Sequence, residues 1–577
     1  MTFFGNSGDK MITQGVNVRR GAAVGFILSA AVLAAHSALA QSTTTTEVPA
    51  TQVPSAQVPA TEVQPAVPAL SAEALALRTA LEGRLGRDSA ALTAYAARNY
   101  KPIWLNEDGS TNAAAKVLTE FLSRASEHAL PAAKYKGAAL TARLGERGPR
   151  LEADLTAAFL SYAGDVKTGF LTPRRIDREL HIFPETPDEG FLIERAGRAA
   201  DMAAFLDELA PSDPLYRRLI ERYAAFRSIA GQEIWGPSVS KGRTLRPGNR
   251  NSRVAQVRAR LTAMGDLDPN VYDQRAADDG TKVAAANVTT DVPVQSFDAD
   301  LFDDPMVEAL QRFQARHGLN LDGVIGPATL RQLNVSPRTR AEQIAVNLER
   351  LRWMNRDLGE RHILVNLASF TFDVMHNGKS EFHSRAVVGK KKHKTPEFSD
   401  EMTHMVINPT WYIPTSIKEK EILPKLANDP NYLVNRNMKM LSSGRLIQKP
   451  GRGNALGTVK FMFPNQFAIY LHDTPSKRLF KRDVRAYSHG CVRVERPHEF
   501  AEYLLTGQVD DPRGYFNRIL KRGRERQVNL DNPLPVHLTY RSAWIDEHGI
   551  EQFRGDIYGR DGKIARAMKN AGVSILQ

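Results

Sequence analysis

The 577-residue sequence predicts a multidomain α+β protein with a helical scaffold domain, a small three-helix module and a mostly-β domain that contains an inserted helical cap. Three observations predict this fold class. Leucine and alanine recur with the helical period over 71–241, a second helical segment with tight glycine turns occupies 242–335, and short β-branched runs dominate after residue 360. At about 150 residues per domain, the length suits roughly four units.

The composition narrows the class of protein. With 42% hydrophobic and 24% charged residues, the chain is neither fibrous nor globally disordered. Its 77 Lys+Arg outnumber 64 Asp+Glu, and the resulting net charge of +13 favours contact with polyanions. Cys491 is the single cysteine of the sequence, so an intrachain disulfide and a Cys-rich zinc site are both excluded.

The first 40 residues predict a secretory signal peptide. Basic residues precede an apolar run over 21–35, and Ala38-Leu39-Ala40 supplies a cleavage site. The run is shorter than the ~20 residues of a bilayer span, and an uncleaved anchor is the alternative; no cysteine follows it, which excludes a lipoprotein anchor there. In both cases we expect export, so that the basic surface meets wall polymer or anionic lipid rather than nucleic acid, with membrane contact only if the segment is retained.

A proline-rich linker over 41–70 follows, in which Val-Pro recurs every five residues. Each proline biases its neighbour toward extended backbone, which predicts a semi-rigid tether. The helical scaffold domain over 71–241 begins with Leu77, Leu81 and Leu85 on one helix face. We find no chemical motif in it and interpret it as a scaffold or interaction domain.

The unit over 242–335 contains two amphipathic helices and a third short one. It resembles the small three-helix peptidoglycan-binding repeat, whose characteristic residues are matched by Phe313-Gln314, Gly318-Leu319, Asp322-Gly323, Gly326 and Thr329. A polar insertion over about 266–300 interrupts the first half and could block or remodel a binding groove. The alternative is a module that serves only packing.

The predicted mostly-β domain occupies 361–530. Short strands alternate with turn signals, of which Asn377-Gly378 is a strong hairpin turn. A Lys/Glu-rich helical stretch over about 415–445 breaks the pattern and is interpreted as an inserted cap. We assign 531–577 to a C-terminal β-hairpin and tail.

The chemistry of this domain is predicted around one thiol. A thiol is a weak nucleophile until a base removes its proton, and His472 lies nineteen positions before Cys491. Gly490 permits a tight backbone turn, so that the amides of His489, Gly490 and Cys491 could face a developing oxyanion. Arg493 is positioned in the sequence to pair with a substrate carboxylate.

These residues match the signature of the L,D-transpeptidases of bacterial cell walls, in which a histidine precedes Ser/Thr-His-Gly-Cys by about fifteen residues. His472, Ser488, His489, Gly490 and Cys491 occupy that signature in order, and Arg493 fits its usual continuation. The resemblance extends over most of 71–577 and is to the large exported enzymes of Gram-negative bacteria. It implies that Cys491 is the nucleophile, that His472 is its general base and that His489 helps to shape the site.

The resemblance also implies a substrate cleft. Tyr470 and the segment that contains Trp411 and Tyr412 are similar to the family's cleft wall. Asp473 follows the base where some members have Gly or Ser, which leaves open what orients the imidazole.

The implied reaction is two acyl transfers on peptidoglycan. The thiolate attacks the bond between the diamino acid of a stem tetrapeptide and its terminal D-alanine, and a neighbouring stem amine then takes the acyl group in a 3→3 cross-link. The resemblance implies that the reaction needs no cofactor and no metal. It also implies that the protein acts in the periplasm, and that its partners are stem peptides and other wall-synthesis enzymes. The family chemistry also predicts acylation of the thiol by carbapenems.

Two alternatives stay open: a carboxypeptidase or endopeptidase that uses water as acceptor, and a non-catalytic wall-binding scaffold with a structural Cys491. A zinc site is disfavoured, because His383, His393, His404 and His472 show no H-E-x-x-H pairing. A nucleotide loop at 451–457 is disfavoured too, since its glycine spacing is wrong and it precedes a strand.

Overall fold

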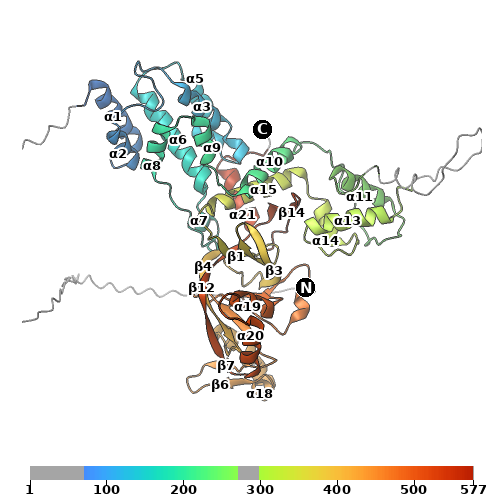
Figure 1. The fold of residues 1–577 in the computed structure, drawn as a ribbon. Helices are drawn as coiled ribbons and strands as arrows, with labels where there is room; N and C mark the ends of the chain where they lie inside the picture. Colours follow the sequence, from blue (N-terminus) through green and yellow to red (C-terminus); the bar gives the residue numbers. More distant parts are fainter. Residues whose placement is uncertain (1–69, 269, 271–297, 576–577) are drawn as a thin grey trace, which may run out of the picture. The chain divides into compact units, whose positions relative to one another are not determined.

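The computed structural model describes residues 70–268, 270 and 298–575 (Figure 1). The predicted signal peptide, nearly all of the linker and most of the insertion over 266–300 lie outside the described residues. Within those residues, no helix combines the length and the apolar character that crossing a bilayer requires.

The scaffold domain is helical, as predicted. Leu77 and Leu81 are buried on one face of its first helix, and Trp104 is buried after the left-handed residues Asn99 and Tyr100. Its helices are α1 (Ala72–Leu85), α2 (Ala90–Ala97), α3 (Ala113–Ser123), η1 (Ala125–His128), α4 (Ala132–Tyr135), α5 (Gly137–Ala142), α6 (Pro149–Thr168), α7 (Pro173–Ile176), α8 (Glu189–Arg198), α9 (Met202–Glu208) and α10 (Pro214–Ser228).

The three-helix module consists of α11 (Ser252–Ala263), α13 (Asp304–Arg316) and α14 (Pro327–Leu333). Its characteristic glutamine is structural: Gln314 donates to Asp322 Oδ1 at 2.8 Å and accepts from the Gly323 amide at 3.0 Å. The module packs through His317, whose ring stacks on that of Phe553 at 5.8 Å.

A nine-stranded sheet forms the mostly-β domain, in the order β10-β3-β11-β9-β8-β4-β12-β1-β2. Strand β2 also pairs with β3, so the strands from β3 round to β2 close into a ring. The strands are β1 (Arg361–Asn366), β2 (Thr371–His376), β3 (Lys379–Gly389), β4 (Phe398–Ile407), β8 (Val459–Met462), β9 (Leu471–His472), β10 (Ala486–Ser488), β11 (Val492–Val494) and β12 (Arg526–Thr539).

One side of this sheet faces an aromatic core. Phe500, from α19 (Pro497–Leu505), packs its ring 5.0 Å from that of Phe372 and 4.5 Å from that of Phe461. Phe516 from α20 (Pro512–Lys521) belongs to the same core, which also buries Leu471 and Val492. This burial fixes which residues of the short strands β9 and β11 face away from the core, and therefore where their polar side chains lie.

The predicted cap is an insertion with a small core of its own, around Ile413, Ile422 and Leu446. A three-stranded sheet extends it beyond the predicted 415–445. Its elements are β5 (Trp411–Tyr412), α16 (Thr415–Ile417), the π-helix η2 (Lys418–Ile422), α17 (Leu423–Asn428), α18 (Tyr432–Asn435), β6 (Met438–Met440) and β7 (Leu446–Gln448).

The boundary predicted at residue 530 is wrong, because it cuts β12, which lies between β4 and β1. The register of β12 shifts between Asn529 and Leu534, and the polar, proline-containing sequence at that bulge is typical of a turn. Only a short hairpin, β13 (Ala543–Ile545) with β14 (Glu551–Phe553), and α21 (Arg560–Asn570) follow the sheet. The remaining element of the domain is η3 (Lys477–Lys481).

The helix α15 (Pro337–Trp353) lies in a stretch that the sequence analysis left unassigned. It is buried although it carries charges, and two ion pairs compensate for three of them: Arg352 with Glu349 at 2.5 Å, and Arg350 with Asp561 of α21 at 2.5 Å. The buried Arg340 instead donates to Gln332 Oε1 at 2.9 Å. Pairing is the condition under which buried charges are tolerated. Such a helix has no clean apolar stripe, so periodicity did not reveal it.

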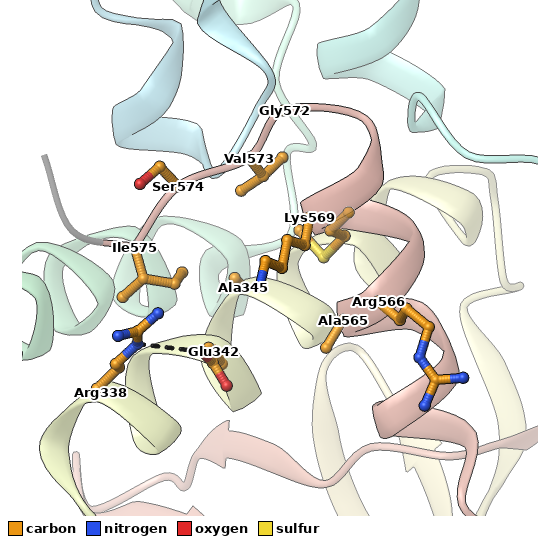
Figure 2. A pocket seen from close by; sticks show the side chains of 11 residues that line it. Arg338, Glu342, Ala345, Ala565, Arg566, Lys569, Gly572, Val573, Ser574 and Ile575 are labelled. Carbon is orange, nitrogen blue, oxygen red and sulfur yellow. Dashed lines mark ion pairs between the residues drawn. The ribbon is translucent and has the colours of Figure 1, made fainter.

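A pocket of about 550 Å³ lies where α15 and α21 meet residues 572–575 (Figure 2). Ala345, Ala565 and Ile575 contribute to its apolar lining, and the ion pair of Arg338 with Glu342, at 3.5 Å, lies beside it. It contains none of the predicted site residues.

Candidate active site

The predicted nucleophile and base lie on adjacent parallel strands. Strand β11 pairs with β9 so that Arg493 is opposite His472, and the Val492 amide donates to the Tyr470 carbonyl at 3.1 Å. Paired residues and residues two apart share one face of a sheet. Tyr470, His472, Cys491 and Arg493 therefore lie together on the face opposite Leu471 and Val492.

The imidazole of His472 is buried and oriented by the main chain. Its Nδ1 lies 2.5 Å from the carbonyl oxygen of Asp473, which accepts a hydrogen bond from the ring N–H. This bond assigns the Nδ1–H tautomer and leaves Nε2 as an acceptor. Burial, with the nearby Arg493 charge, lowers the pKa of His472 to about 3. The ring is therefore neutral near pH 7 and able to take a proton.

The main-chain carbonyl of Asp473 orients the His472 ring, while its side-chain carboxylate holds the chain around residue 473 in place. The carboxylate accepts from the Thr458 amide at 2.9 Å and the Thr458 hydroxyl at 2.8 Å, and it pairs with Lys477 at 2.7 Å. Gly457 has φ +65°, and a Cβ there would lie 2.3 Å from the Asp473 carboxyl. The glycine that ends the loop over 451–457 is thus required by this packing, which accounts for it without a nucleotide.

The thiol of Cys491 is partly buried and protonated at rest. Burial raises its pKa to about 11, although the amide and hydroxyl of Tyr470 and the charges of Arg493 and Lys460 oppose this rise. The thiol donates to the Ala468 carbonyl, with Sγ 3.6 Å from the oxygen. Thiol and imidazole are therefore both neutral near pH 7.

Backbone geometry beside the thiol depends on Gly490, whose φ is +127°. A Cβ at this position would lie 3.0 Å from Ile469 Cδ1. The Ser488 hydroxyl donates to the Cys491 carbonyl at 2.5 Å and accepts from the Gly490 amide at 3.1 Å, while Thr395 Oγ1 donates to the Gly490 carbonyl at 2.7 Å. These bonds close the turn that presents the thiol.

One of the three predicted oxyanion donors is already engaged. The Gly490 amide donates to Ser488, so it is satisfied within the turn rather than directed at a substrate. This corrects its predicted role, for the physical reason that a buried amide takes an internal acceptor when one lies within reach. The amides of His489 and Cys491 remain the predicted donors.

Three parts of the chain match known protein families. Residues 360–512 match the family model described as the L,D-transpeptidase catalytic domain, 89–222 match the scaffold domain, and 291–333 match the "Putative peptidoglycan binding domain". The chain is 32% identical over 252 residues to the protein named "Putative L,D-transpeptidase" of Haemophilus influenzae, covering 40% of this chain and 50% of that protein. Residues 360–512 are thus similar to an L,D-transpeptidase catalytic domain.

Two further similarities are weaker. The chain is 26% identical over 225 residues to the N-acetylmuramoyl-L-alanine amidase CwlM of Mycobacterium tuberculosis, covering 38% of this chain and 48% of that protein. The crystal structure of an L,D-transpeptidase from Stackebrandtia nassauensis matches with a TM-score of 0.20 and 11% identity, covering 52% of this chain and 96% of that chain. The chain spans about half the length of the curated relatives it matches.

In the mostly-β domain, Arg493 presents a guanidinium on the thiol's face. Its Nε is buried and has no hydrogen-bond partner among the described residues. Burial lowers the pKa of Arg493, and the nearby Cys491 offsets part of this effect. A buried donor without a partner is costly, and an incoming carboxylate would satisfy it.

His489 contacts Glu421 in the cap of the mostly-β domain. Its Nε2 lies 2.6 Å from Glu421 Oε1 in η2 and 2.9 Å from Lys390 Nζ, and its ring is 4.9 Å from that of His393. The ring therefore shapes the site by linking the nucleophile's turn to the cap. Glu421 and Lys390 were missed in the sequence because neither is near the signature.

Of the predicted cleft residues, the structure brings only Tyr470 to the thiol. Its ring lies edge-on to His472 at 5.7 Å, and its hydroxyl interacts with Cys491. Trp411 and Tyr412 form β5 in the small cap sheet, where they pair with β7. Lys460, which pairs with His472 in the register, was missed; the alternation of polar and buried residues in its strand was the available signal.

Three of the four histidines weighed as a zinc site have separate hydrogen-bond partners, and His393 has a ring contact with His489. His383 lies 2.8 Å from Asp373 Oδ1, His404 lies 2.9 Å from Thr403 Oγ1, and His472 binds the Asp473 carbonyl. Within residues 70–268, 270 and 298–575, no three His, Cys, Asp or Glu side chains come together in a geometry that could hold a metal ion.

Proposed function

We propose that this protein is a cysteine-dependent L,D-transpeptidase that acts on peptidoglycan. The observation that carries the proposal is the shared face of β9 and β11, on which a neutral, main-chain-oriented His472 accompanies the thiol of Cys491. The match of residues 360–512 to the L,D-transpeptidase catalytic domain supports it.

In the first step, Nε2 of His472 takes the thiol proton as Sγ attacks the carbonyl between the diamino acid and the terminal D-alanine of a stem tetrapeptide. The amides of His489 and Cys491 stabilise the oxyanion, with each such donor worth about 3–4 kcal/mol. His472 then returns the proton to the departing D-alanine nitrogen, and a thioester on Cys491 remains.

In the second step, a side-chain amine of a neighbouring stem attacks the thioester. His472 takes a proton from the attacking nitrogen and delivers it to the departing sulfur, which restores the neutral pair and leaves a 3→3 amide cross-link. Arg493 binds a carboxylate of the donor stem, since its guanidinium lies on the same face as the thiol.

We further propose that the protein acts after export to the periplasm. The basic start, apolar run and Ala38-Leu39-Ala40 support this location. The matched peptidoglycan binding domain supports wall polymer as the partner of the module over 242–335, and other wall-synthesis enzymes are proposed partners of the scaffold domain.

The test is intact mass of the full chain after incubation with a carbapenem, alongside Cys491→Ala and His472→Ala. One adduct on the wild-type protein, none on Cys491→Ala and slow formation on His472→Ala are expected. Folded protein without any adduct would contradict an activated thiol.

Tetrapeptide muropeptides then test the acceptor. Release of D-alanine together with a cross-linked dimer supports transpeptidation. Release of D-alanine with a tripeptide product alone, even with excess amine, would assign water as the acceptor and replace the proposal with a carboxypeptidase.

A further inference from the structure

A short segment of the scaffold domain, residues 179–182 between α7 and α8, is attached to the mostly-β domain. The amide of His181 donates to the Glu397 carbonyl at 2.8 Å, and the amide of Glu397 donates to the Glu179 carbonyl at 3.0 Å. Leu180, which forms a parallel bridge with Glu397, is fully buried. Because Glu397 directly precedes β4, these main-chain hydrogen bonds fix the scaffold segment to the start of a strand of the large sheet.

The ring of His181 packs on a phenylalanine from the loop that precedes β9. Its centroid lies 4.3 Å from that of Phe467, and the ring of Phe398 lies 4.8 Å from the same phenylalanine. Nδ1 of His181 is buried and has no hydrogen-bond partner in the part of the chain that the structure describes. The imidazole therefore contributes to this contact by its packing rather than through Nδ1.

The loop that contains Phe467, residues 463–469, has an internally bonded conformation. The Asn465 side chain accepts from the amides of Phe467, at 3.0 Å, and Ile469, at 3.2 Å. Between these two residues Ala468 has φ +53°, a left-handed conformation that is unfavourable for a residue with a Cβ. Such a conformation persists only where the surrounding contacts hold it. The ring on which His181 packs belongs to the residue directly before this strained position.

This loop contacts the nucleophile's turn at two points. The Ala468 carbonyl accepts a hydrogen bond from the thiol of Cys491, with Sγ 3.6 Å from the oxygen. Cδ1 of Ile469 borders Gly490, where an added Cβ would lie 3.0 Å from it. A continuous path of contacts thus leads from the His181 ring through the loop to the thiol.

We infer that His181 of the scaffold domain is a positioning residue of the active site, because its ring holds the loop over 463–469 so that the Ala468 carbonyl orients the thiol. The inference rests on the proposed function, since it takes Cys491 as the nucleophile of the acyl transfer. It gives the scaffold domain a part in the reaction that no motif of its own sequence indicated.

The hydrogen bond to Ala468 acts on the rotation of the cysteine side chain. A cysteine rotates among three staggered positions, and this bond favours the one that the structure shows. Attack requires one orientation of the sulfur, so a loop that shifts lowers the fraction of thiol that is ready to react.

The test compares full-length wild type with His181→Ala, which removes the ring, and His181→Phe, which keeps an aromatic ring without the nitrogens. The matched control is Phe183→Ala. It removes an exposed ring from the same connection, and this ring lies beside Arg174 rather than the loop. Circular dichroism and thermal melts establish that each chain is folded, and all rates are measured well below the lowest melting temperature.

Carbapenem acylation, followed by intact mass, should slow about threefold in His181→Ala, because a released side chain shares its population among three staggered positions. His181→Phe and Phe183→Ala should acylate at the wild-type rate. Alkylation by iodoacetamide at about pH 8 should change in the opposite direction in His181→Ala and rise about twofold or more. A looser loop exposes the sulfur and withdraws the acceptor that favours the protonated thiol.

Equal acylation by His181→Ala and wild type would overturn the inference. A loss that His181→Phe does not restore, or an equal loss in Phe183→Ala, would overturn it as well. Phe467→Leu tests the same contact from the side of the loop. It should slow acylation by a similar factor and add little to His181→Ala, since both substitutions remove one contact. Two effects that simply multiply would assign the residues to separate contacts and refute the path.

Alkylation separates this inference from the proposed function. It needs only an accessible, deprotonated thiol, and so it reports on the His181 contact without any acyl transfer. Absence of carbapenem acylation in every folded chain would refute the proposed function. The alkylation of His181→Ala and Phe183→Ala would still judge the contact, and equal rates in these two chains would overturn it.

Discussion

The Nδ1 atom of His472 lies 2.5 Å from the carbonyl oxygen of Asp473, so the residue that follows the base orients it. A main-chain acceptor fixes the tautomer without adding a negative charge beside the ring. With burial, this leaves His472 neutral on the same sheet face as a protonated thiol. Under the proposed function, the pair is activated only as the sulfur attacks.

The neutral pair predicts how the thiol responds to pH. In His472→Ala, alkylation by iodoacetamide should rise about tenfold per pH unit up to a pH near 11, because burial raises the pKa of Cys491 to about 11 and only the thiolate reacts. The rate is measured by intact mass from pH 6 to 11, with free cysteine as the comparison. A plateau near pH 8.5, as for free cysteine, would show that burial does not raise this pKa.

Gly490→Ala should lose both stability and reactivity. At φ +127° a side chain is strained, typically by about 1–3 kcal/mol, and the new Cβ would lie 3.0 Å from Ile469 Cδ1. Carbapenem acylation should slow at least tenfold as the turn that presents the thiol shifts. Gly453→Ala, where a Cβ has open space, is the matched control and should behave as wild type. Equal acylation by both variants would show that the turn does not position the thiol.

Asp473→Asn should lower the free energy of unfolding by about 1–3 kcal/mol at pH 7, because an amide cannot replace a buried carboxylate that accepts from Thr458 and pairs with Lys477. Burial raises the pKa of Asp473, but Lys477 and Thr458 outweigh it and lower the pKa below its usual value. The stability from this carboxylate is therefore present above its unfolded pKa and is lost as the pH falls through the folded one.

Chemical denaturation at pH 7 and pH 3 measures the effect of Asp473→Asn. The difference from wild type should be smaller at pH 3, and a difference that grows as pH falls would contradict the assignment. Since the Asp473 carbonyl is retained, carbapenem acylation should change less than it does in His472→Ala.

The scaffold domain should lose stability between about pH 4.5 and 7 because of Glu152. Its buried carboxyl accepts from the amides of Ile103, at 2.6 Å, and Trp104, at 2.9 Å, yet burial raises its pKa to about 7. The folded state then holds a proton that the unfolded chain releases near pH 4.5, so rising pH favours unfolding across this window.

Thermal melts of wild type and Glu152→Gln across pH 4 to 8 test this linkage. The substituted amide does not titrate, so the fall in melting temperature over that window should be smaller in Glu152→Gln. Parallel pH profiles for the two proteins would show that another group is responsible.

The sequence determined much of the organisation of this protein, because local patterns carry it. The helical period predicted the scaffold domain, the Asn377-Gly378 turn predicted the first hairpin, and the break in the strand pattern at 415–445 predicted the cap. Residue types at fixed spacing also predicted Cys491 and His472 as the reactive pair, since the chemistry of a thiol and an imidazole belongs to the side chains themselves.

Only the tertiary structure decided what those residues experience. The parallel pairing of β9 with β11 brings together residues that are nineteen positions apart, and non-local burial sets their pKa values. The sequence pattern did not predict the full length of β12, because a bulge interrupts it, and did not predict α15, because its buried face carries paired charges. Both elements depend on partners that are distant in the chain. The contact of His489 with Glu421 was also not predictable from the sequence. The direction of a side chain follows from the completed packing, which sequence spacing does not encode.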